Sequence, residues 1–134
     1  MVWSLVIDSL LVELDREGFE VVGYADDIAI LVRGKFDSVI SDRMQTALNV
    51  VWNWCLRNGL GVNPSKTVLI PCTKKRSLRI TRPLLGNQLL EFQDQVKCLG
   101  VILDSKLTFS SHVQKVIAKA TNSFMACKSI MCRK

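Results

Sequence analysis

The sequence predicts an α+β fold in which helices cover one face of an antiparallel sheet. Two apolar runs between residues 21 and 32 are broken once, by the adjacent aspartates Asp26 and Asp27. Val, Ile and Tyr favour strands, whereas Asp is depleted in strands and tolerated in turns, so we expect a β-hairpin with two carboxylates at its tip. Segments with helical periodicity lie on both sides of this hairpin, and that order is typical of a two-layer α+β sandwich.

The segment before the hairpin predicts an amphipathic helix. Its apolar residues recur at alternating spacings of three and one, which places them on one face of a helix that ends near Gly18. These residues are Trp3, Val6, Ile7, Leu10, Leu11 and Leu14. A helix therefore leads directly into the hairpin.

A second helix is expected after the hairpin, with Asp37 or Ser38 as its cap and Gly59 at its end. Its apolar face carries Ile40, Met44, Ala47, Leu48, Val51 and Cys55. Trp52 and Trp54 lie near its end. We interpret them as packing groups in preference to platforms for base stacking, because aromatic side chains at helical spacing more often pack.

From Lys66 onward the sequence becomes strand-like, with a turn at Gly86 and Asn87. The predicted strands are 67–72, 78–80, 88–92 and 96–103. The first two are separated by a basic loop that contains Lys74, Lys75 and Arg76. This loop serves either solubility or contact with phosphate, and the sequence leaves both open.

The last segment predicts a helix with Ser110 and Ser111 as its cap. Its apolar stripe consists of Val113, Val116, Ile117, Ala120, Phe124, Cys127 and Met131. Lys115 and Lys119 lie one turn apart and off this stripe, so they belong either to a solvated face or to one that faces phosphate. We expect one structural unit with an articulation near Asp104.

Charge is distributed unevenly along the chain, whose net charge is +6 at pH 7. Residues 1–56 carry four Lys/Arg against nine Asp/Glu, and residues 57–134 carry fourteen against three. The basic half is either an ordinary solvated surface or a surface for a polyanion, since phosphate neutralisation supplies most non-specific affinity for nucleic acids.

The five cysteines include no C-x-x-C pair, so the sequence supports neither a zinc site nor a disulfide framework. Scattered mostly at apolar positions, they fit small buried groups in a reducing compartment. No apolar run reaches membrane-spanning length, and the N-terminus has no secretory signal. We therefore expect an intracellular protein, nuclear or cytoplasmic or both, that is not secreted and does not enter a membrane.

Asp26 and Asp27 are the candidate metal ligands. Two like charges held side by side repel each other, and a bound divalent cation makes such a pair favourable. Mg²⁺ fits best, because it takes one or two carboxylates together with substrate phosphates. An isolated pair of aspartates is also ordinary turn chemistry, so the surrounding residues decide between the two interpretations.

Three motifs in order favour the metal site. Residues 24–27 read Tyr-Ala-Asp-Asp between two apolar strands, residues 63–67 read Asn-Pro-Ser-Lys-Thr, and residues 97–101 read Lys-Cys-Leu-Gly-Val. In this order the chain resembles the reverse transcriptases of LINE-type (non-LTR) retrotransposons, whose central palm motif is the first of the three. The resemblance runs to about Phe109, and more loosely through the final helix.

The resemblance implies that residues 1–104 are part of a polymerase palm and that residues 105–134 begin the thumb. The fingers and the first palm strand, which carries a further metal-binding aspartate, would precede Met1, so we expect a missing N-terminal polymerase portion. The parent would be an RNA-directed DNA polymerase that uses an RNA template, a DNA primer, deoxynucleoside triphosphates and two Mg²⁺ ions about 4 Å apart. An incomplete catalytic unit loses most of its activity, so we expect the chain alone to be inactive.

The resemblance also implies roles for individual residues. Asp26 would bind metal directly with Asp27 in support. Lys66 either donates a proton to the leaving pyrophosphate, as the motif implies, or is an ordinary surface charge. Tyr24 either packs against the primer end, as in the family, or packs within the sheet. The remaining candidate contacts to nucleic acid are Leu99 and Gly100 in a primer-grip turn, Lys115 and Lys119 in the thumb helix, and Lys74, Lys75 and Arg76 in the basic loop.

The primer-grip motif departs from the family at Cys98, where an aromatic residue is frequent. Gly100 would let the backbone approach the primer phosphate, although a strand bulge is the alternative. Two other functions remain open from the sequence. The first is a non-catalytic nucleic-acid-binding remnant of such an element. The second is an unrelated α+β interaction domain in which the hairpin is a coincidence.

Overall fold

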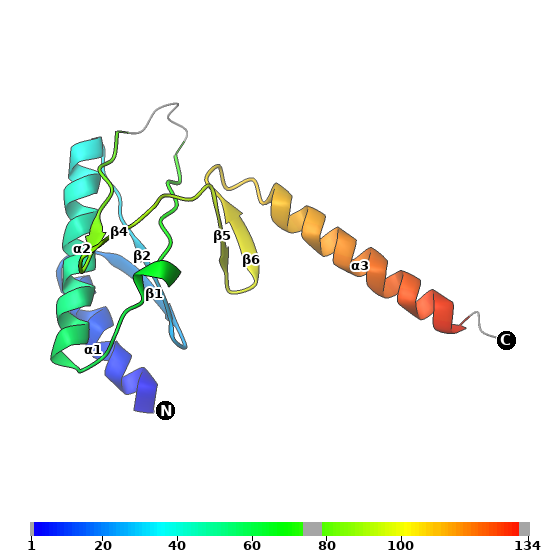
Figure 1. Cartoon of the computed structure of the whole chain (residues 1–134), viewed down its shortest axis with the longest axis horizontal. Helices are drawn as coiled ribbons and strands as arrows, with labels where there is room; N and C mark the ends of the chain where they lie inside the picture. Colours follow the sequence, from blue (N-terminus) through cyan, green and yellow to red (C-terminus); the bar gives the residue numbers. More distant parts are fainter. Residues whose placement is uncertain (1, 74–78, 132–134) are drawn as a thin grey trace. The chain divides into compact units, whose positions relative to one another are not determined.

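The computed structural model describes residues 2–73 and 79–131, which form helices and short antiparallel hairpins (Figure 1). The elements in chain order are α1 (Val2–Arg16), β1 (Glu20–Tyr24), β2 (Asp27–Leu31), α2 (Asp37–Arg57), the 3-10 helix η1 (Pro64–Lys66), β3 (Leu84–Leu85), β4 (Gln88–Leu89), β5 (Gln95–Cys98), β6 (Val101–Asp104) and α3 (Ser110–Met131). They belong to two compact units, the first with residues 2–67 and 79–91 and the second with residues 68–73 and 92–131. The predicted α+β class is confirmed.

The core of the first unit lies between α1, α2 and one face of the β1–β2 hairpin. Its buried members are Ile7, Leu10, Leu14, Phe19, Ala47, Trp54 and Cys55. Most of them belong to the two predicted helix stripes, so the periodicity identified the inner faces of both helices. Val21 and Ile30, which are partners across the hairpin, pack against this core, whereas Val22 is 66% exposed on the other face. Each fully buried leucine stabilises the unit by about 1.5–3 kcal/mol.

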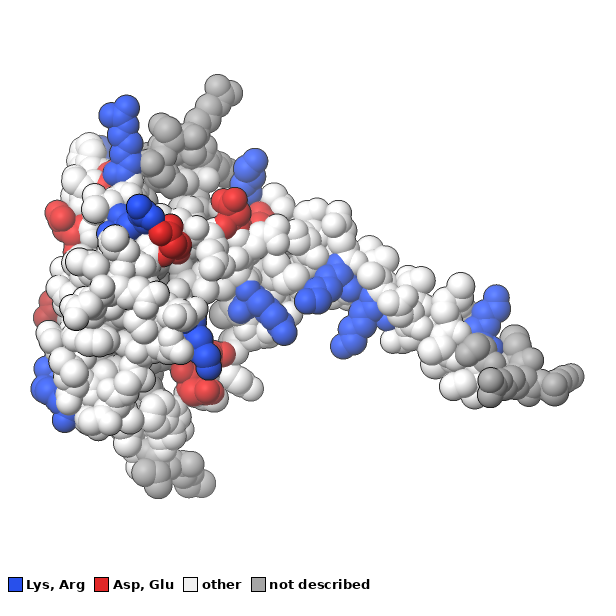
Figure 2. All heavy atoms as spheres, in the orientation of Figure 1, with Lys and Arg blue, Asp and Glu red and all other residues white. Residues whose placement is uncertain are grey.

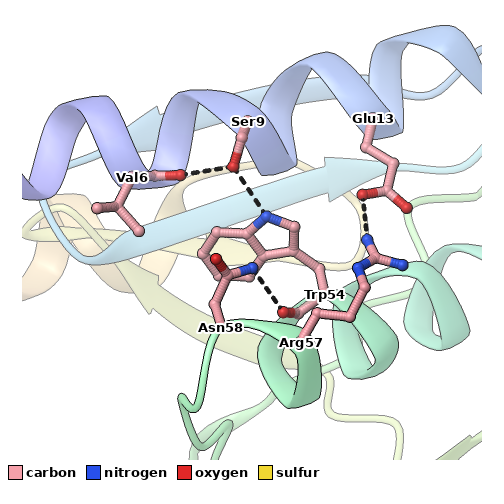
Figure 3. Close-up of polar contacts among 6 residues, drawn as sticks. All are labelled: Val6, Ser9, Glu13, Trp54, Arg57 and Asn58. Atoms are coloured by element: carbon pink, nitrogen blue, oxygen red, sulfur yellow. Dashed lines mark hydrogen bonds and ion pairs between the residues drawn. The ribbon is translucent and has the colours of Figure 1, made fainter.

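Polar contacts join α1 to the end of α2 around Trp54, as Figure 3 shows. The Trp54 indole Nε1 donates to Ser9 Oγ at 2.9 Å, and the Arg57 guanidinium pairs with Glu13 at 2.6 Å. Asn58, the C-cap of α2, donates its side-chain amide to the Trp54 carbonyl at 2.8 Å. Trp54 is only 3% exposed, which confirms its interpretation as a packing group.

The beginning of α2 differs from the prediction, whereas its end does not. Phe36 is the N-cap residue and makes no side-chain cap hydrogen bond, so neither Asp37 nor Ser38 caps the helix. Asp37 is instead the first helical residue, and its carboxylate accepts the backbone N–H of Arg79 at 3.0 Å. This tertiary hydrogen bond takes up the carboxylate that the sequence pattern assigned to the cap. At the other end Gly59 has a φ of 63°, the left-handed conformation that commonly ends a helix.

The Gln45 side chain of α2 hydrogen-bonds to the β3–β4 hairpin. The Gln45 amide accepts the Leu84 N–H at 2.8 Å and donates to the Leu84 carbonyl at 2.9 Å. Leu85 and Leu90 beside it are 1% and 2% exposed. The predicted turn lies where the sequence placed it, between the two strands.

Gly86 in that turn lies directly against Trp52. It has a φ of 61°, and a Cβ added to it would lie 2.6 Å from the Trp52 ring. Trp52 is therefore also a packing group, as predicted. The turn therefore needs glycine twice, because a side chain would collide with Trp52 and because the positive φ favours glycine.

Replacing Gly86 by alanine is expected to lower the free energy of unfolding by about 2–4 kcal/mol, from left-handed strain plus overpacking against Trp52. Gly59→Ala is a matched control, because Gly59 has a φ of 63° but no atom within 4 Å of the added Cβ. It should lose only the strain contribution of about 1–2 kcal/mol. Urea unfolding followed by tryptophan fluorescence measures both, and equal losses would contradict the packing argument.

Two of the predicted strands do not form. Residues 67–72 contribute only a single parallel bridge, between Leu69 and Phe92. Pro71 removes one backbone donor from this segment, which disfavours a longer ladder. Residues 79–80 are irregular as well, and Leu78 lies outside the described residues.

The strands that do form are shorter than predicted. The strand expected at 88–92 is limited to Gln88–Leu89. Three separate two-stranded antiparallel sheets result in the part of the chain that the structure describes, in place of the single antiparallel sheet that we predicted.

The segment 96–103, predicted as one strand, is a hairpin in the second unit. β5 pairs with β6 from Gln95 opposite Asp104 to Cys98 opposite Val101. Leu99 and Gly100 form the turn with φ values of 48° and 85°. Positive φ at both central residues is the geometry of a tight hairpin turn that matches strand twist. Gly100 is thus a turn residue and not a strand bulge.

The Asp104 side chain organises the turn between β6 and α3. Its carboxylate accepts the backbone N–H groups of Lys106, Thr108 and Phe109 at 3.1, 3.1 and 2.7 Å, and also the Thr108 hydroxyl. These hydrogen bonds, that of the Thr108 N–H first, lower the pKa of Asp104. The articulation expected here is therefore a hydrogen-bonded turn. The chain forms two compact units, divided at residues 67/68 and 91/92, so the expectation of one structural unit was wrong.

The final helix α3 forms where the pattern predicts it, but Ser110 and Ser111 are its first residues and not its cap. The Ser110 N–H donates to the Thr108 hydroxyl at 3.4 Å. His112 in its first turn accepts the Ile102 N–H through Nδ1 at 3.4 Å. The apolar stripe beyond is exposed, as Phe124 at 67% illustrates. Among the helices of residues 2–73 and 79–131, none combines the length and apolar character needed to span a membrane.

The cysteines are less buried than the sequence suggests. Four are described and all are free thiols: Cys55 is buried, Cys98 is half-buried, and Cys72 and Cys127 are exposed. Burial raises the pKa of the Cys55 thiol. Their apolar neighbours in the sequence are themselves partly exposed, which is why the pattern overestimated burial.

Candidate functional site

The β1–β2 hairpin presents both aspartates at its tip. Tyr24 and Asp27 form the last pair of the ladder, so Ala25 and Asp26 make a two-residue turn. Asp26 therefore lies in the turn, as predicted, whereas Asp27 is the first residue of β2. Both are exposed, and so is Tyr24, at 65%. Tyr24 is thus no part of the core of this unit.

Neither aspartate carboxylate has a hydrogen-bond or ion-pair partner within the described residues. Two exposed, unpaired carboxylates on consecutive residues have the oxygen donors that Mg²⁺ prefers, and they fit one or two positions in its coordination sphere. In residues 2–73 and 79–131 no group of three or more His, Cys, Asp or Glu could hold a metal ion. The pair therefore fits as part of a metal site that needs further ligands.

The Ala25–Asp26 turn has a strained backbone, and a side chain of α1 hydrogen-bonds to it. Ala25 has a φ of 53°, in the left-handed region that costs an L-residue about 1–2 kcal/mol. The Trp3 indole Nε1 donates to the Ala25 carbonyl at 3.0 Å. A Cβ added to Gly23, two residues before the turn, would lie 3.3 Å from the Leu11 side chain, so glycine permits the close approach of α1.

Lys66 lies at the end of η1, which a local side-chain cap fixes. Asn63 Oδ1 accepts the Ser65 N–H at 3.0 Å, and the Thr67 hydroxyl donates to the Asn63 carbonyl at 3.1 Å. Pro64 at the first position of η1 supplies the preset φ of a helix start. Lys66 is exposed and belongs to the same unit as the hairpin.

The other predicted contacts belong to the second unit or lie outside the described residues. Leu99, 53% exposed, and Gly100 form the tip of the β5–β6 hairpin. Lys115 and Lys119 are exposed on α3. The basic-loop residues Lys74, Lys75 and Arg76 lie outside the described residues.

The charge on α3 has one sign. The helix contains Lys115, Lys119 and Lys128 and no acidic residue. Figure 2 accordingly shows basic side chains without acidic ones along the visible face of this helix. Such a surface suits a polyanionic partner.

Sequence reasoning missed two features of the site. Trp3 was assigned to the core stripe only, and its pairing with Ala25 across 22 positions leaves no short-range signal. The Asn63 cap did have a short-range sequence signal, because Asn followed by Pro and Ser is a turn signature.

Comparisons with known proteins bear on the same segment. The family model described as "Reverse transcriptase (RNA-dependent DNA polymerase)" matches residues 1–103. The chain is 24% identical to the "Retrovirus-related Pol polyprotein from type-1 retrotransposable element R1 2" of Nasonia vitripennis, over 99% of this chain and 34% of that protein. It is 33% identical to the "Probable RNA-directed DNA polymerase from transposon BS" of Drosophila melanogaster, over 83% of this chain and 12% of that protein. The "RNA-directed DNA polymerase from mobile element jockey" of the same species is 28% identical over 78% of this chain and 11% of that protein.

The chain thus spans about a third or less of the length of these relatives. No solved structure matches it. The family match covers the hairpin with its aspartates, the lysine of η1 and the β5–β6 turn. The chain belongs to the reverse transcriptase (RNA-dependent DNA polymerase) family, within the LINE-type, non-LTR retrotransposon group.

Proposed function

We propose that this chain is part of an RNA-directed DNA polymerase of a non-LTR retrotransposon, with residues 1–104 in the palm and residues 105–134 at the start of the thumb. The observation that carries the proposal is the pair Asp26 and Asp27, exposed and without a partner among the described residues, at the tip of a hairpin that α1 and α2 support. The matched relatives are several times longer, so the fingers and a further palm strand come from a portion outside this chain. Alone, the chain is inactive in this proposal.

The reaction is the addition of a deoxynucleotide to a DNA primer on an RNA template. The primer 3′-hydroxyl loses its proton to water and its oxygen bonds to the α-phosphorus of the incoming triphosphate. The bond between the α-phosphorus and the oxygen that bridges to the β-phosphorus breaks, and pyrophosphate leaves. Asp26 and Asp27 would hold Mg²⁺, with Asp26 as the direct ligand. Bound Mg²⁺ supplies electrostatic stabilisation of the attacking and leaving oxygens.

Other residues of this chain position or protonate the reactants. Lys66 donates a proton to the leaving pyrophosphate, and the Asn63 cap holds the turn that presents it. Tyr24, exposed beside the turn, packs against the primer end. Leu99 and Gly100 contact the primer backbone as a grip. The site of action is intracellular, in the nucleus, the cytoplasm or both.

The basic surface supports contact with nucleic acid independently of catalysis. Lys115 and Lys119 on α3, together with Lys74, Lys75 and Arg76, would contact phosphates of the template and primer. This observation also favours the second candidate function, a non-catalytic nucleic-acid-binding remnant that leaves the aspartates without a role. Catalytic activity in a complete polymerase separates the two.

The isolated chain is expected to bind RNA and DNA weakly, without sequence preference, and with an affinity that falls steeply as salt rises. Each phosphate contact contributes roughly 0.7 to 0.9 to the slope of log K against log salt. The double variant Lys115→Ala/Lys119→Ala should lower that slope by about 1.4 to 1.8. Fluorescence anisotropy with a labelled oligonucleotide measures it.

A charge-matched control for this titration is Arg16→Ala/Lys35→Ala in the first unit, which should leave the slope unchanged. Equal slopes for both double variants and the unmodified chain would show that α3 presents only a solvated face. Replacing Lys74, Lys75 and Arg76 by alanine tests the basic loop in the same way.

A further inference from the structure

Trp3 makes the one long-range side-chain hydrogen bond that the structure shows to the aspartate turn. Its indole Nε1 lies 3.0 Å from the carbonyl oxygen of Ala25, the residue immediately before Asp26. The indole is 40% exposed at the beginning of α1, so core packing alone does not account for its position. Trp3 is partly exposed and lies 22 positions from Ala25 in the sequence, so its hydrogen bond is a tertiary contact directed at this turn.

Ala25 is the residue of the turn that needs such support. Its φ of 53° is a conformation that two-residue hairpin turns usually assign to glycine at this position. A non-glycine residue persists there when the surrounding structure over-determines it, and such strain gathers at functional sites. The ladder fixes the turn on its strand side through the pair Tyr24 and Asp27, and Trp3 fixes the carbonyl that faces α1.

A second contact fixes the same strand to α1. Leu11 lies against the backbone of Gly23, at a distance that leaves little room for a Cβ. Helix α1 thus holds the hairpin at Gly23 by packing and at Ala25 by a hydrogen bond. The two contacts lie on either side of Tyr24 and define the direction in which the turn projects.

We propose that Trp3 is a positioning residue for the metal-binding turn, and that its indole N–H holds the Ala25 carbonyl so that Asp26 and Asp27 are preorganised to receive a divalent cation. This inference rests on the proposed function for the identity of the ligands. Trp3 touches neither metal nor substrate. It acts through the backbone of Ala25.

The test uses the whole chain labelled with ¹⁵N and the variant Trp3→Phe, which keeps an aromatic ring and removes the donor. Trp54→Phe is the matched control, because it removes another indole hydrogen bond, that to Ser9, at a distance from the turn. We expect backbone ¹⁵N relaxation to show increased motion at Asp26 and Asp27 in Trp3→Phe and not in Trp54→Phe. Unchanged relaxation at the turn of a folded Trp3→Phe protein would overturn the inference.

Titration with Mn²⁺ provides a second readout, in which paramagnetic broadening of the Asp26 and Asp27 amides reports binding. Loss of one hydrogen bond should weaken this binding about three- to tenfold in Trp3→Phe, and Trp54→Phe should stay within about twofold of the unmodified chain. Binding of equal strength in Trp3→Phe and the unmodified chain would overturn the positioning role. Asp26→Asn/Asp27→Asn should abolish the broadening.

The arms of this experiment distinguish the two proposals. Broadening that persists without both aspartates, or that is absent in the unmodified chain, counts against the proposed metal ligands, while turn relaxation still decides the role of Trp3. Should Trp3→Phe not fold, the unmodified chain decides: a Trp3 indole proton that exchanges slowly with solvent supports the hydrogen bond, and one that exchanges as fast as a free indole overturns it.

Discussion

Replacing Asp26 by asparagine in a complete polymerase that contains this segment is expected to abolish DNA synthesis on an RNA template, with a loss of at least about a thousandfold. Asparagine keeps the size of the side chain and removes its charge, and Mg²⁺ binding depends on the charged carboxylate. The host for this test is a chimaera, in which the jockey RNA-directed DNA polymerase of Drosophila melanogaster receives this chain in place of its matching segment.

The control for this prediction is Asp8→Asn, which removes another exposed carboxylate of the first unit, from α1. It should leave incorporation within about twofold, because surface charges away from the reacting groups contribute little. Asp27→Asn should lose less activity than Asp26→Asn, because the proposal makes Asp26 the direct metal ligand and gives Asp27 a supporting role. Steady synthesis in Asp26→Asn would remove the catalytic role of the turn.

Replacing Lys66 by alanine in the same chimaera is expected to slow single-turnover incorporation by about a hundredfold, within the usual range for the loss of a general acid. The affinity for the triphosphate should change less than the rate, because Lys66 acts on the leaving pyrophosphate in the proposed function. Rapid-quench measurements separate the rate from the affinity.

Three further variants make the Lys66 result specific. Lys35→Ala removes an exposed lysine of the same unit and should leave the rate unchanged. Asn63→Ala removes the acceptor for the Ser65 N–H, and Asn63→Asp restores an acceptor oxygen in the same place. We expect a loss of about three- to tenfold in Asn63→Ala that Asn63→Asp recovers. Equal incorporation rates in Lys66→Ala and the unmodified chimaera would exclude Lys66 as the proton donor.

The helices could be predicted from the sequence because each has a long apolar stripe. α1, α2 and α3 run for 15, 21 and 22 residues, which is enough for a helical period to be recognised. In α1 and α2 the stripe is the inner face, whereas the stripe of α3 is exposed. Their first residues were harder to place, since Asp37 gives its carboxylate to the distant Arg79 N–H and not to the helix cap. A tertiary partner of this kind has no local sequence signal.

The strands could be predicted only where a turn residue separated them clearly. Gly86 and Asn87 marked the β3–β4 turn correctly, because glycine supplies its positive φ. Leu99 supplies a positive φ as well, although leucine is not a turn residue, so the pattern joined β5 and β6 into one strand. The segment at 67–72 is apolar enough for a strand and still forms only one bridge, which shows how far strand pairing depends on neighbours.

The position of the aspartates at a hairpin tip was predictable, and the support of that turn was not. The chemical roles of Asp26, Asp27 and Lys66 stay predictions. Adjacent aspartates between apolar runs identified the hairpin tip, and the motif at residues 63–67 identified Lys66. The strained φ of Ala25 and the indole of Trp3 that holds it could not be predicted, because both arise from the packing of α1 on the hairpin.

The most direct test of the central claim is RNA-templated primer extension by the unmodified chimaera with Mg²⁺ and deoxynucleoside triphosphates. We expect template-directed incorporation, because in the proposed function residues 1–103, which match the family, supply the metal-binding turn and the host supplies the rest of the polymerase. Thermal unfolding and binding to a primer–template duplex establish that the chimaera is folded. A folded chimaera that binds the duplex and incorporates no nucleotide, while the original jockey polymerase does, would contradict the proposal that this chain is a working polymerase segment.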